Sequence, residues 1–174
     1  MGKAWKLYFC AFDMKVILGL GNPGVEYAGT RHNAGMALVE RLASGMWRKH
    51  YDALVCKTPG MMLVKSKEIF MNESGRLLQG LPEGELYIAH DDLDLKLGEF
   101  KIQFGKGPKD HHGLESVERA LGTKDFWRVR IGIDNRTTPI DGETYVLQKF
   151  TSEEKKTLEG VLERIAQEIL NITP

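Results

Sequence analysis

The segment MKVILGLGNPG, residues 14–24, decides the fold of this chain. Its apolar run from Val16 to Leu20 is short, continuous and closed by glycine, which predicts a buried central strand. Pro23 and Gly24 then form a turn, so the strand presents Asn22 at its carboxyl end, where α/β proteins usually build their sites. Because the segment reads as a self-sufficient start, residues 1–13 are interpreted as an N-terminal extension and 14–174 as the folded domain.

The glycines of the same segment match the pattern G-x-G-x-x-G, which often marks a dinucleotide site. In that fold the helix opens inside the glycine motif, so that its amides meet the pyrophosphate. Here polar loop continues to about His32, and no acidic residue ends a second strand about 20 residues later. The pattern therefore favours a tight turn over a nucleotide site.

Strands and helices alternate along the rest of the chain. Short apolar or alternating runs predict strands at 62–64, 86–89, 99–104 and 128–133. Helical spacing predicts helices at 33–46, where Met46 closes the apolar stripe, and at 114–121, and a last helix begins at a capping box of Thr151 and Glu154. This alternation predicts a single α/β domain with a central sheet and helices on both faces.

Composition narrows the class of protein. The chain has 174 residues, 42% of them hydrophobic and 28% charged, as in an ordinary single domain. It has no apolar run of about 20 residues and no clear export signal, and its two cysteines match no metal-ligand spacing, which favours a cytoplasmic protein. Zero net charge argues against binding nucleic acid over the whole surface, but residues 96–136 carry a small local excess of lysine and arginine.

Several polar residues stand where chemistry is possible. His32 lies at the start of the first predicted helix, whose positive end disfavours the imidazolium form and so lowers the pKa of the ring. Asp91, in the run His90–Asp94, follows a strand and is placed to orient a histidine, although a solvated acidic turn is the simpler reading. Asn72 and the pair His111–His112 precede helices, where capping is the commoner role. No nucleophile motif is present, so water activated by a histidine is the economical hydrolytic mechanism.

Six segments together resemble the bacterial-type peptidyl-tRNA hydrolases. They occur in the family's order and cover most of residues 14–150. They are VILGLGNPG (16–24), Tyr27 with TRHNAG (30–35), FMNESG (70–75), AHDDLD (89–94), HGL (112–114) and FWRVRIGI (126–133).

The resemblance implies a twisted mixed sheet and a monomeric enzyme without metal or cofactor. It would free tRNA from prematurely released peptidyl-tRNA in the cytoplasm, with no membrane partner. His32 would be the catalytic base, held by Asp91. The remaining expected roles are substrate binding or catalysis for Asn22, Asn72 and His112, lining of the cleft for Tyr27 and Met71, and tRNA phosphate binding for Arg130, Arg128, Lys106 and Lys101.

Three positions depart from the family's pattern. His112 stands where the family usually has an asparagine that positions water or substrate. Gln103 stands at a phosphate-binding lysine, for which Lys101 or Lys106 would compensate. The family's glycine-rich gate reads GKGPKD here, residues 105–110, which is stiffer and more charged.

Two rival functions follow from these residues. A non-catalytic RNA-binding relative of the same fold would keep the basic surface and tolerate changes in the site. A metal-dependent hydrolase would use histidine and carboxylate ligands that suit zinc or manganese. Its ligands would be drawn from His32, His90, Asp91, Asp94 and His112.

Overall fold

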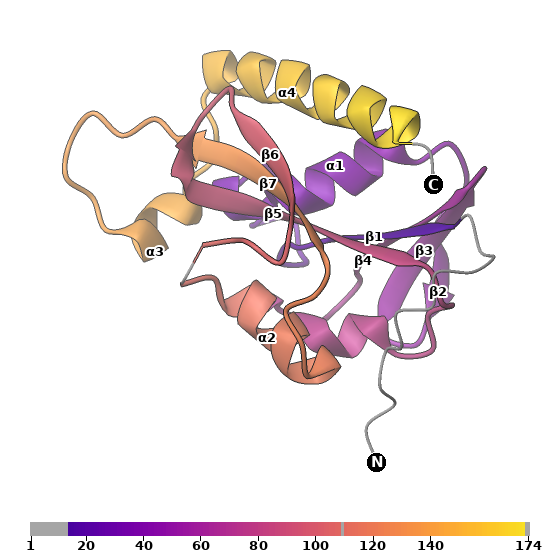
Figure 1. Ribbon diagram of the computed structural model, residues 1–174. Helices are drawn as coiled ribbons and strands as arrows, with labels where there is room; N and C mark the ends of the chain where they lie inside the picture. Colours follow the sequence, from indigo (N-terminus) through magenta and orange to yellow (C-terminus); the bar gives the residue numbers. More distant parts are fainter. Residues whose placement is uncertain (1–13, 109, 173–174) are drawn as a thin grey trace.

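One seven-stranded mixed sheet forms the centre of the molecule, in the order β2-β3-β4-β1-β5-β7-β6 (Figure 1). The four central strands β4, β1, β5 and β7 are parallel, and antiparallel strands flank them on both sides. The strands are β1 (Lys15–Gly19), β2 (Arg48–His50), β3 (Ala53–Thr58), β4 (Met61–Ser66), β5 (Glu85–Lys96), β6 (Phe100–Phe104) and β7 (Trp127–Asp134). The predicted mixed α/β sheet is confirmed.

This computed structural model describes residues 14–108 and 110–172. The proposed extension 1–13 and Lys109 of the glycine-rich segment lie outside the described residues. Within them, no helix combines the length and the apolar character that crossing a membrane requires.

Helices cover both faces of the sheet, as predicted. Helices α1 (Ala34–Leu42) and α4 (Ser152–Asn171) lie on one face, and the 3-10 helix η2 (Met71–Leu78) and α2 (His112–Leu121) lie on the other (Figure 1). Strand β1 serves both layers, because Ile17 packs into the core beneath α1 and α4 while Val16 and Leu18 pack into the core beneath η2 and α2. This alternation is the period of two that a strand imposes on its side chains.

The last helix begins where its capping box predicts. The Thr151 hydroxyl accepts from the Glu154 amide at 3.2 Å, and the Glu154 carboxylate accepts from the Thr151 amide at 2.8 Å. The predicted apolar stripe is buried along its length, at Leu158, Val161, Leu162, Ile165 and Ile169. Such a cap adds about 1 kcal/mol to helix stability, and the stripe contributes more through burial.

Two predicted boundaries are wrong. The first helix ends at Leu42 instead of 46, because Ser44 and Gly45 favour irregular backbone, and Met46 is 76% exposed instead of lying in the stripe. Strand β5 continues through the predicted acidic turn to Lys96, because Asp92 is satisfied inside the sheet by Arg130 and by the backbone amide of Asp94. The sequence analysis also missed β2, β3 and the short helix α3 (Gly142–Val146).

The first turn of helix α1 lies directly against the sheet at two glycines. A Cβ at Gly35 would overlap the carbonyl oxygen of Ala89 in β5, and a Cβ at Gly19 would overlap the carbonyl of Gly35. The Leu20 amide donates to that Ala89 carbonyl at 2.9 Å, and the Met36 amide donates to Leu20 at 2.9 Å. The start of α1 is therefore fixed to β1 and β5 by direct backbone contact.

Candidate active site

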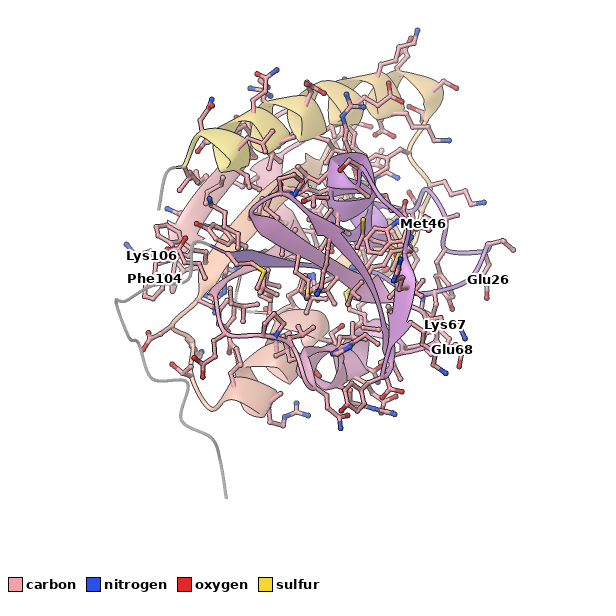
Figure 2. The ribbon with its side chains drawn as sticks, turned by 90° about the vertical axis from the view of Figure 1, so that its right-hand side faces the viewer. Glu26, Met46, Lys67, Glu68, Phe104 and Lys106 are labelled. Atoms are coloured by element: carbon pink, nitrogen blue, oxygen red, sulfur yellow. The ribbon has the colours of Figure 1, made fainter. Side chains whose placement is uncertain are left out.

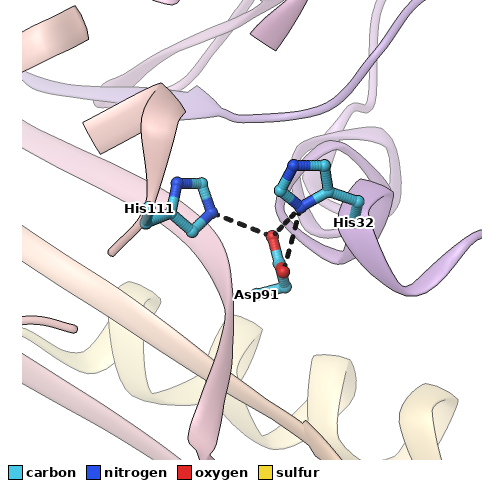
Figure 3. A group of neighbouring side chains, drawn as sticks. All are labelled: His32, Asp91 and His111. Atoms are coloured by element: carbon cyan, nitrogen blue, oxygen red, sulfur yellow. Dashed lines mark hydrogen bonds and ion pairs between the residues drawn. The ribbon is translucent and has the colours of Figure 1, made fainter. Parts of the chain in front are cut away.

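Three side chains from separate elements meet at the carboxyl edge of the parallel strands (Figure 3). His32 lies on the 3-10 helix η1 (Arg31–Asn33), which leads into α1, and Asp91 lies on β5. His111 immediately precedes α2 on the other face of the sheet. Parallel strands bring their carboxyl ends to one edge, which is why segments far apart in sequence converge here.

His32 and Asp91 form the central pair, as the sequence analysis expected of them. Nδ1 of His32 lies 2.9 and 3.0 Å from the two carboxylate oxygens of Asp91. Asp91 accepts at both oxygens, so Nδ1 carries the hydrogen and Nε2 keeps its lone pair. The His32 side chain is 17% exposed and that of Asp91 only 3%, so the histidine is the member that solvent reaches.

His111 belongs to the cluster, whereas the sequence analysis named the pair His111–His112 as candidates and then gave a site role only to His112. Its Nε2 lies 3.0 Å from Oδ1 of Asp91, and its Nδ1 accepts from the backbone amide of Leu114 at 3.3 Å. That amide fixes the ring as an Nε2–H tautomer, which donates to Asp91. His112, in contrast, is exposed and lies 3.4 Å from Glu115. The structure therefore places His112 on the outer side of α2 and His111 in the cluster.

The pKa values of Asp91 and His32 shift in opposite directions in this cluster. Burial alone would raise the pKa of Asp91, but the charges and hydrogen bonds of His32 and His111 hold it well below its usual range. Burial alone would lower the pKa of His32, but the charge and hydrogen bond of Asp91 outweigh it, so the net shift is upward. The charge and hydrogen bond of Asp91 therefore decide the net direction of the His32 pKa shift, whatever the positive end of the helix contributes.

A third histidine, His90, supports the cluster from inside the sheet. It is fully buried, and its Nδ1 donates to the carbonyl oxygen of Asp91 at 2.7 Å. Its ring packs edge-on against His111 with 5.1 Å between centroids. Burial, followed by the nearby charge of His111, lowers the pKa of His90 to about 3, so this ring is neutral.

Two asparagines fix the turn that follows β1, close in sequence to His32. The side chain of Asn33 bonds both the amide of Asn22 at 2.8 Å and its carbonyl at 2.9 Å, which locks the turn after β1. The side-chain oxygen of Asn22 accepts from the Met71 amide at 2.8 Å, which leaves its NH₂ group as a donor. Asn33 was missed in the sequence analysis, although its place directly after His32 was the available signal.

The other expected cleft residues lie around Asn22. Tyr27 is partly exposed, and its ring meets the half-exposed ring of Phe70 edge-on at 5.9 Å. Met71 is buried at 3% exposure, and Asn72 is exposed, its side chain making no hydrogen bond to another described residue.

The four expected phosphate-binding residues differ in their surroundings. Lys101 and Lys106 are exposed, and Lys106 lies on the side of the molecule away from Glu26 and Met46 (Figure 2). Arg130 is partly buried and bonds Asp92 at 2.7 Å and Gln103 at 2.9 Å. Arg128 is 2% exposed and bonds Glu118 at 2.6 Å, so solvent barely reaches it.

A cavity of about 490 Å³ lies beside the histidine cluster, and three of these four basic residues line it, all but Lys101. His111 lies in its wall, and so do Lys106, Arg128, Arg130 and the glycine-rich segment from Gly105 to Pro108. Four basic residues (Lys106, Lys124, Arg128 and Arg130) outnumber Glu115 and Glu118 in this wall, so a bound polyanion would meet net positive charge beside His111.

The cluster also contains the donor types of a metal centre. One donor atom each from His32, Asp91 and His111 lie within 4.8 Å of one another. Nδ1 of His32 and Nε2 of His111, however, both donate to the Asp91 carboxylate, so a metal ion bound by these two nitrogens would have to displace both hydrogens. His90, Asp94 and His112, which the metal hypothesis also invoked, are not part of this group.

Comparison with known proteins points to one family. The sequence model of the family described as "Peptidyl-tRNA hydrolase" matches residues 16–173. The peptidyl-tRNA hydrolase of Desulfitobacterium hafniense is 38% identical over 164 residues, which cover 87% of this chain and 88% of that protein. That of Mycobacterium avium is 39% identical over 165 residues, covering 87% and 86%. The crystal structure of peptidyl-tRNA hydrolase from Acinetobacter baumannii superposes with a TM-score of 0.78 at 30% identity, covering 91% of this chain and 87% of that one.

Proposed function

Because this chain belongs to the peptidyl-tRNA hydrolase family, we propose that it hydrolyses the ester between peptide and tRNA with His32 as the general base. The reaction follows from the family, and the roles of the individual residues are the proposal. The observation that carries it is the pair of contacts from Nδ1 of His32 to the buried Asp91.

The proposed chemistry begins with a water molecule at Nε2 of His32. Asp91 holds the ring by Nδ1 and stabilises the imidazolium that forms when Nε2 takes a proton from the water. The resulting hydroxide attacks the ester carbonyl carbon, and the tetrahedral intermediate collapses by breaking the bond to the ribose oxygen. His32 returns its proton to that oxygen, so the peptide leaves as an acid and the tRNA as an alcohol. Such help contributes on the order of 100- to 10,000-fold in rate.

Amide groups stand ready for the peptide part of the substrate. We assign the NH₂ group of Asn22 and the exposed side chain of Asn72 to hydrogen bonds with the peptide or with the developing oxyanion. Tyr27 and Met71 form the apolar wall beside them, and His112 contacts substrate from the rim of α2. These roles rest on the residues' places around the cleft.

The tRNA part of the substrate meets the basic cavity. Lys101 and Lys106 are exposed and suited to direct phosphate contact, and Arg130 joins them where its ion pair with Asp92 opens toward the cavity. Arg128 supports the cavity wall from beneath. We further propose a cytoplasmic monomer whose domain spans 14–174, with 1–13 as an extension.

Release of peptide from a peptidyl-tRNA, measured with and without EDTA, tests the base assignment. His32→Ala is expected to lose about 100-fold or more in kcat while still binding tRNA. His50→Ala, at a partly buried histidine outside the cluster, is the matched control and should keep normal turnover. Near-normal turnover by His32→Ala would reject the base, and loss of wild-type activity in EDTA would favour the metal-dependent reading. A protein that bound tRNA without releasing peptide would support the non-catalytic alternative, which the intact His32–Asp91 pair does not favour.

A further inference from the structure

Arg31, the residue directly before His32, is held by the C-terminal part of the chain. It is 4% exposed, and its Nη2 lies 2.8 Å from both carboxylate oxygens of Glu154 in the first turn of α4. Its Nη1 donates to the carbonyls of Gln148 at 3.2 Å and Lys149 at 2.8 Å. Two terminal nitrogens therefore make four contacts with a segment more than a hundred residues away.

The same segment also fixes the backbone and the plane of the guanidinium. The Arg31 amide donates to the Gln148 carbonyl at 3.0 Å, and Thr30 forms an isolated bridge with Lys149. The guanidinium lies 4.3 Å from the ring centre of Tyr145 and 5.1 Å from that of Phe150. Together these contacts hold Arg31 in one position.

Glu154 connects this anchor to two further elements. Its carboxylate caps α4 through the Thr151 amide and accepts from Nδ2 of Asn135, just beyond β7, at 3.2 Å. The Nε hydrogen of Arg31, meanwhile, is buried without a partner among the described residues. A buried ion pair with an unsatisfied donor is a poor way to gain stability, which points to a role in geometry.

We propose that the Arg31–Glu154 pair is a positioning device for His32, which sets the distance and angle between its imidazole and Asp91. The inference rests on the proposed role of His32 as the base. Arg31 contacts no substrate in this scheme; it acts by fixing the backbone from which His32 projects. Displacement of a catalytic group by about 1 Å can cost on the order of 100-fold in rate.

Arg31→Met and Glu154→Gln test the device, because each removes one charge of the pair. Glu154→Gln is the milder change, since glutamine also serves at the third position of a capping box. Both variants should lose about 10- to 100-fold in kcat with KM within about twofold, because the loss falls on the reacting geometry. Arg31→Lys should recover part of the rate, because it keeps the charge but not the two-pronged contact.

The pH dependence of kcat separates positioning from mere structural support. Asp91 on β5 and His111 before α2 are the ionisable groups that face His32. A looser contact with Asp91 leaves burial to dominate, so the acidic limb of the profile should move to lower pH in both variants. General loss of folded protein would scale the whole profile without moving its limb.

Arg41→Met is the matched control, since Arg41 pairs with Glu163 and so also joins the N-terminal half to α4. It should keep wild-type kcat and pH profile. Folded Arg31→Met or Glu154→Gln protein with wild-type kcat and an unmoved limb would overturn the inference, and Glu154→Gln alone decides if Arg31→Met does not fold. The His32→Ala variant distinguishes failure of this inference from failure of the proposed function. Normal turnover by that variant would reject His32 as the base, whatever the Arg31 and Glu154 variants show.

Discussion

Nε2 of His111 lies 3.0 Å from Oδ1 of Asp91 and donates its hydrogen to that oxygen. The same oxygen accepts from His32, so one carboxylate divides its charge between two imidazoles. His111 therefore moderates the pull of Asp91 on the proposed base, and it also caps α2 through its Nδ1. These two roles can be separated by substitution.

His111→Asn should change the pH profile with little effect on stability. Asparagine keeps an acceptor near Nδ1, and is a favoured cap residue, but it cannot reach Asp91. Asp91 would then act on His32 alone, so the pKa of His32 should rise further and the acidic limb of kcat should move to higher pH. His111→Gln is the complementary variant, expected to lose about 1 kcal/mol of stability while leaving the limb in place. Rate–pH profiles and urea unfolding check both, and a limb moved to lower pH in His111→Asn would contradict the assignment.

His112→Ala should raise KM with kcat nearly unchanged. The side chain is exposed on α2 and lies outside the hydrogen-bonded cluster, so its contact with substrate would be similar in the ground and transition states. Steady-state kinetics on a peptidyl-tRNA provide the measurement. A large fall in kcat with KM unchanged would show instead that His112 takes part in the chemistry, as its place in the family pattern suggests.

Arg128→Met and Arg130→Met should both lose stability, since Arg130 also pairs with the fully buried Asp92, but only Arg130→Met should change the salt dependence of tRNA binding. Arg130→Met should weaken tRNA binding and reduce the slope of log affinity against log salt by about 1, as loss of one phosphate contact does. Arg128→Met leaves Glu118 with only its 3.5 Å contact to the exposed Lys124, and because Glu118 is partly solvated the expected cost is about 2 kcal/mol in unfolding free energy. Binding titrations at several salt concentrations, with urea unfolding, distinguish the two. Equal salt slopes in both variants and wild type would reject the phosphate contact at Arg130.

Acid should destabilise the protein through His90 between pH 6.5 and about 3. The pKa of this ring is lowered to about 3 in the fold, so the unfolded chain binds a proton that the folded one refuses. At pH 5 the cost is about 2 kcal/mol relative to pH 7. His32 adds nothing to this loss, because its raised pKa gives stability that is fully present below pH 6.5. Asp91, whose pKa is lowered, adds to the loss only as the pH falls below its usual value of 3.8.

His90→Asn isolates this effect, because its amide can still donate to the Asp91 carbonyl while having no proton to gain. Urea unfolding at pH 7 and pH 5 should show the difference between the two pH values shrink by about 2 kcal/mol in the variant. The same pH dependence in both proteins would assign the acid sensitivity to another group.

Local patterns predicted those elements whose stability is local. The buried strand β1 and the capped helix α4 are encoded by short runs that need no partner to be recognised. The site was harder. His111 and His112 are adjacent, and only the extended backbone at His111, set by the approach of α2 to the sheet, turns the first ring toward Asp91.

The burial of Arg128 is a second feature that local sequence patterns could not predict. Arg128 and Arg130 are two residues apart on β7, so their shared face was predictable from the strand period. Which of the two is reachable depends on Glu118 of α2 and on Gly107, which packs against the Arg128 side chain. Those contacts are tertiary, and no local pattern reports them. The resemblance to a family supplied what the local patterns could not, above all the pairing of His32 with Asp91.

The bare glycine contact between α1 and β5 has a consequence for how this enzyme can vary. Because Gly35 has no side chain that could change size or rotamer, nothing at this contact can adjust the spacing between His32, the proposed base, and Asp91. Natural or engineered substitutions elsewhere can therefore alter the surroundings of the proposed reacting pair without changing the distance between its two members. A methyl group added at Gly35 would force α1 away from β5 and so increase the distance between His32 and Asp91 without contacting either residue.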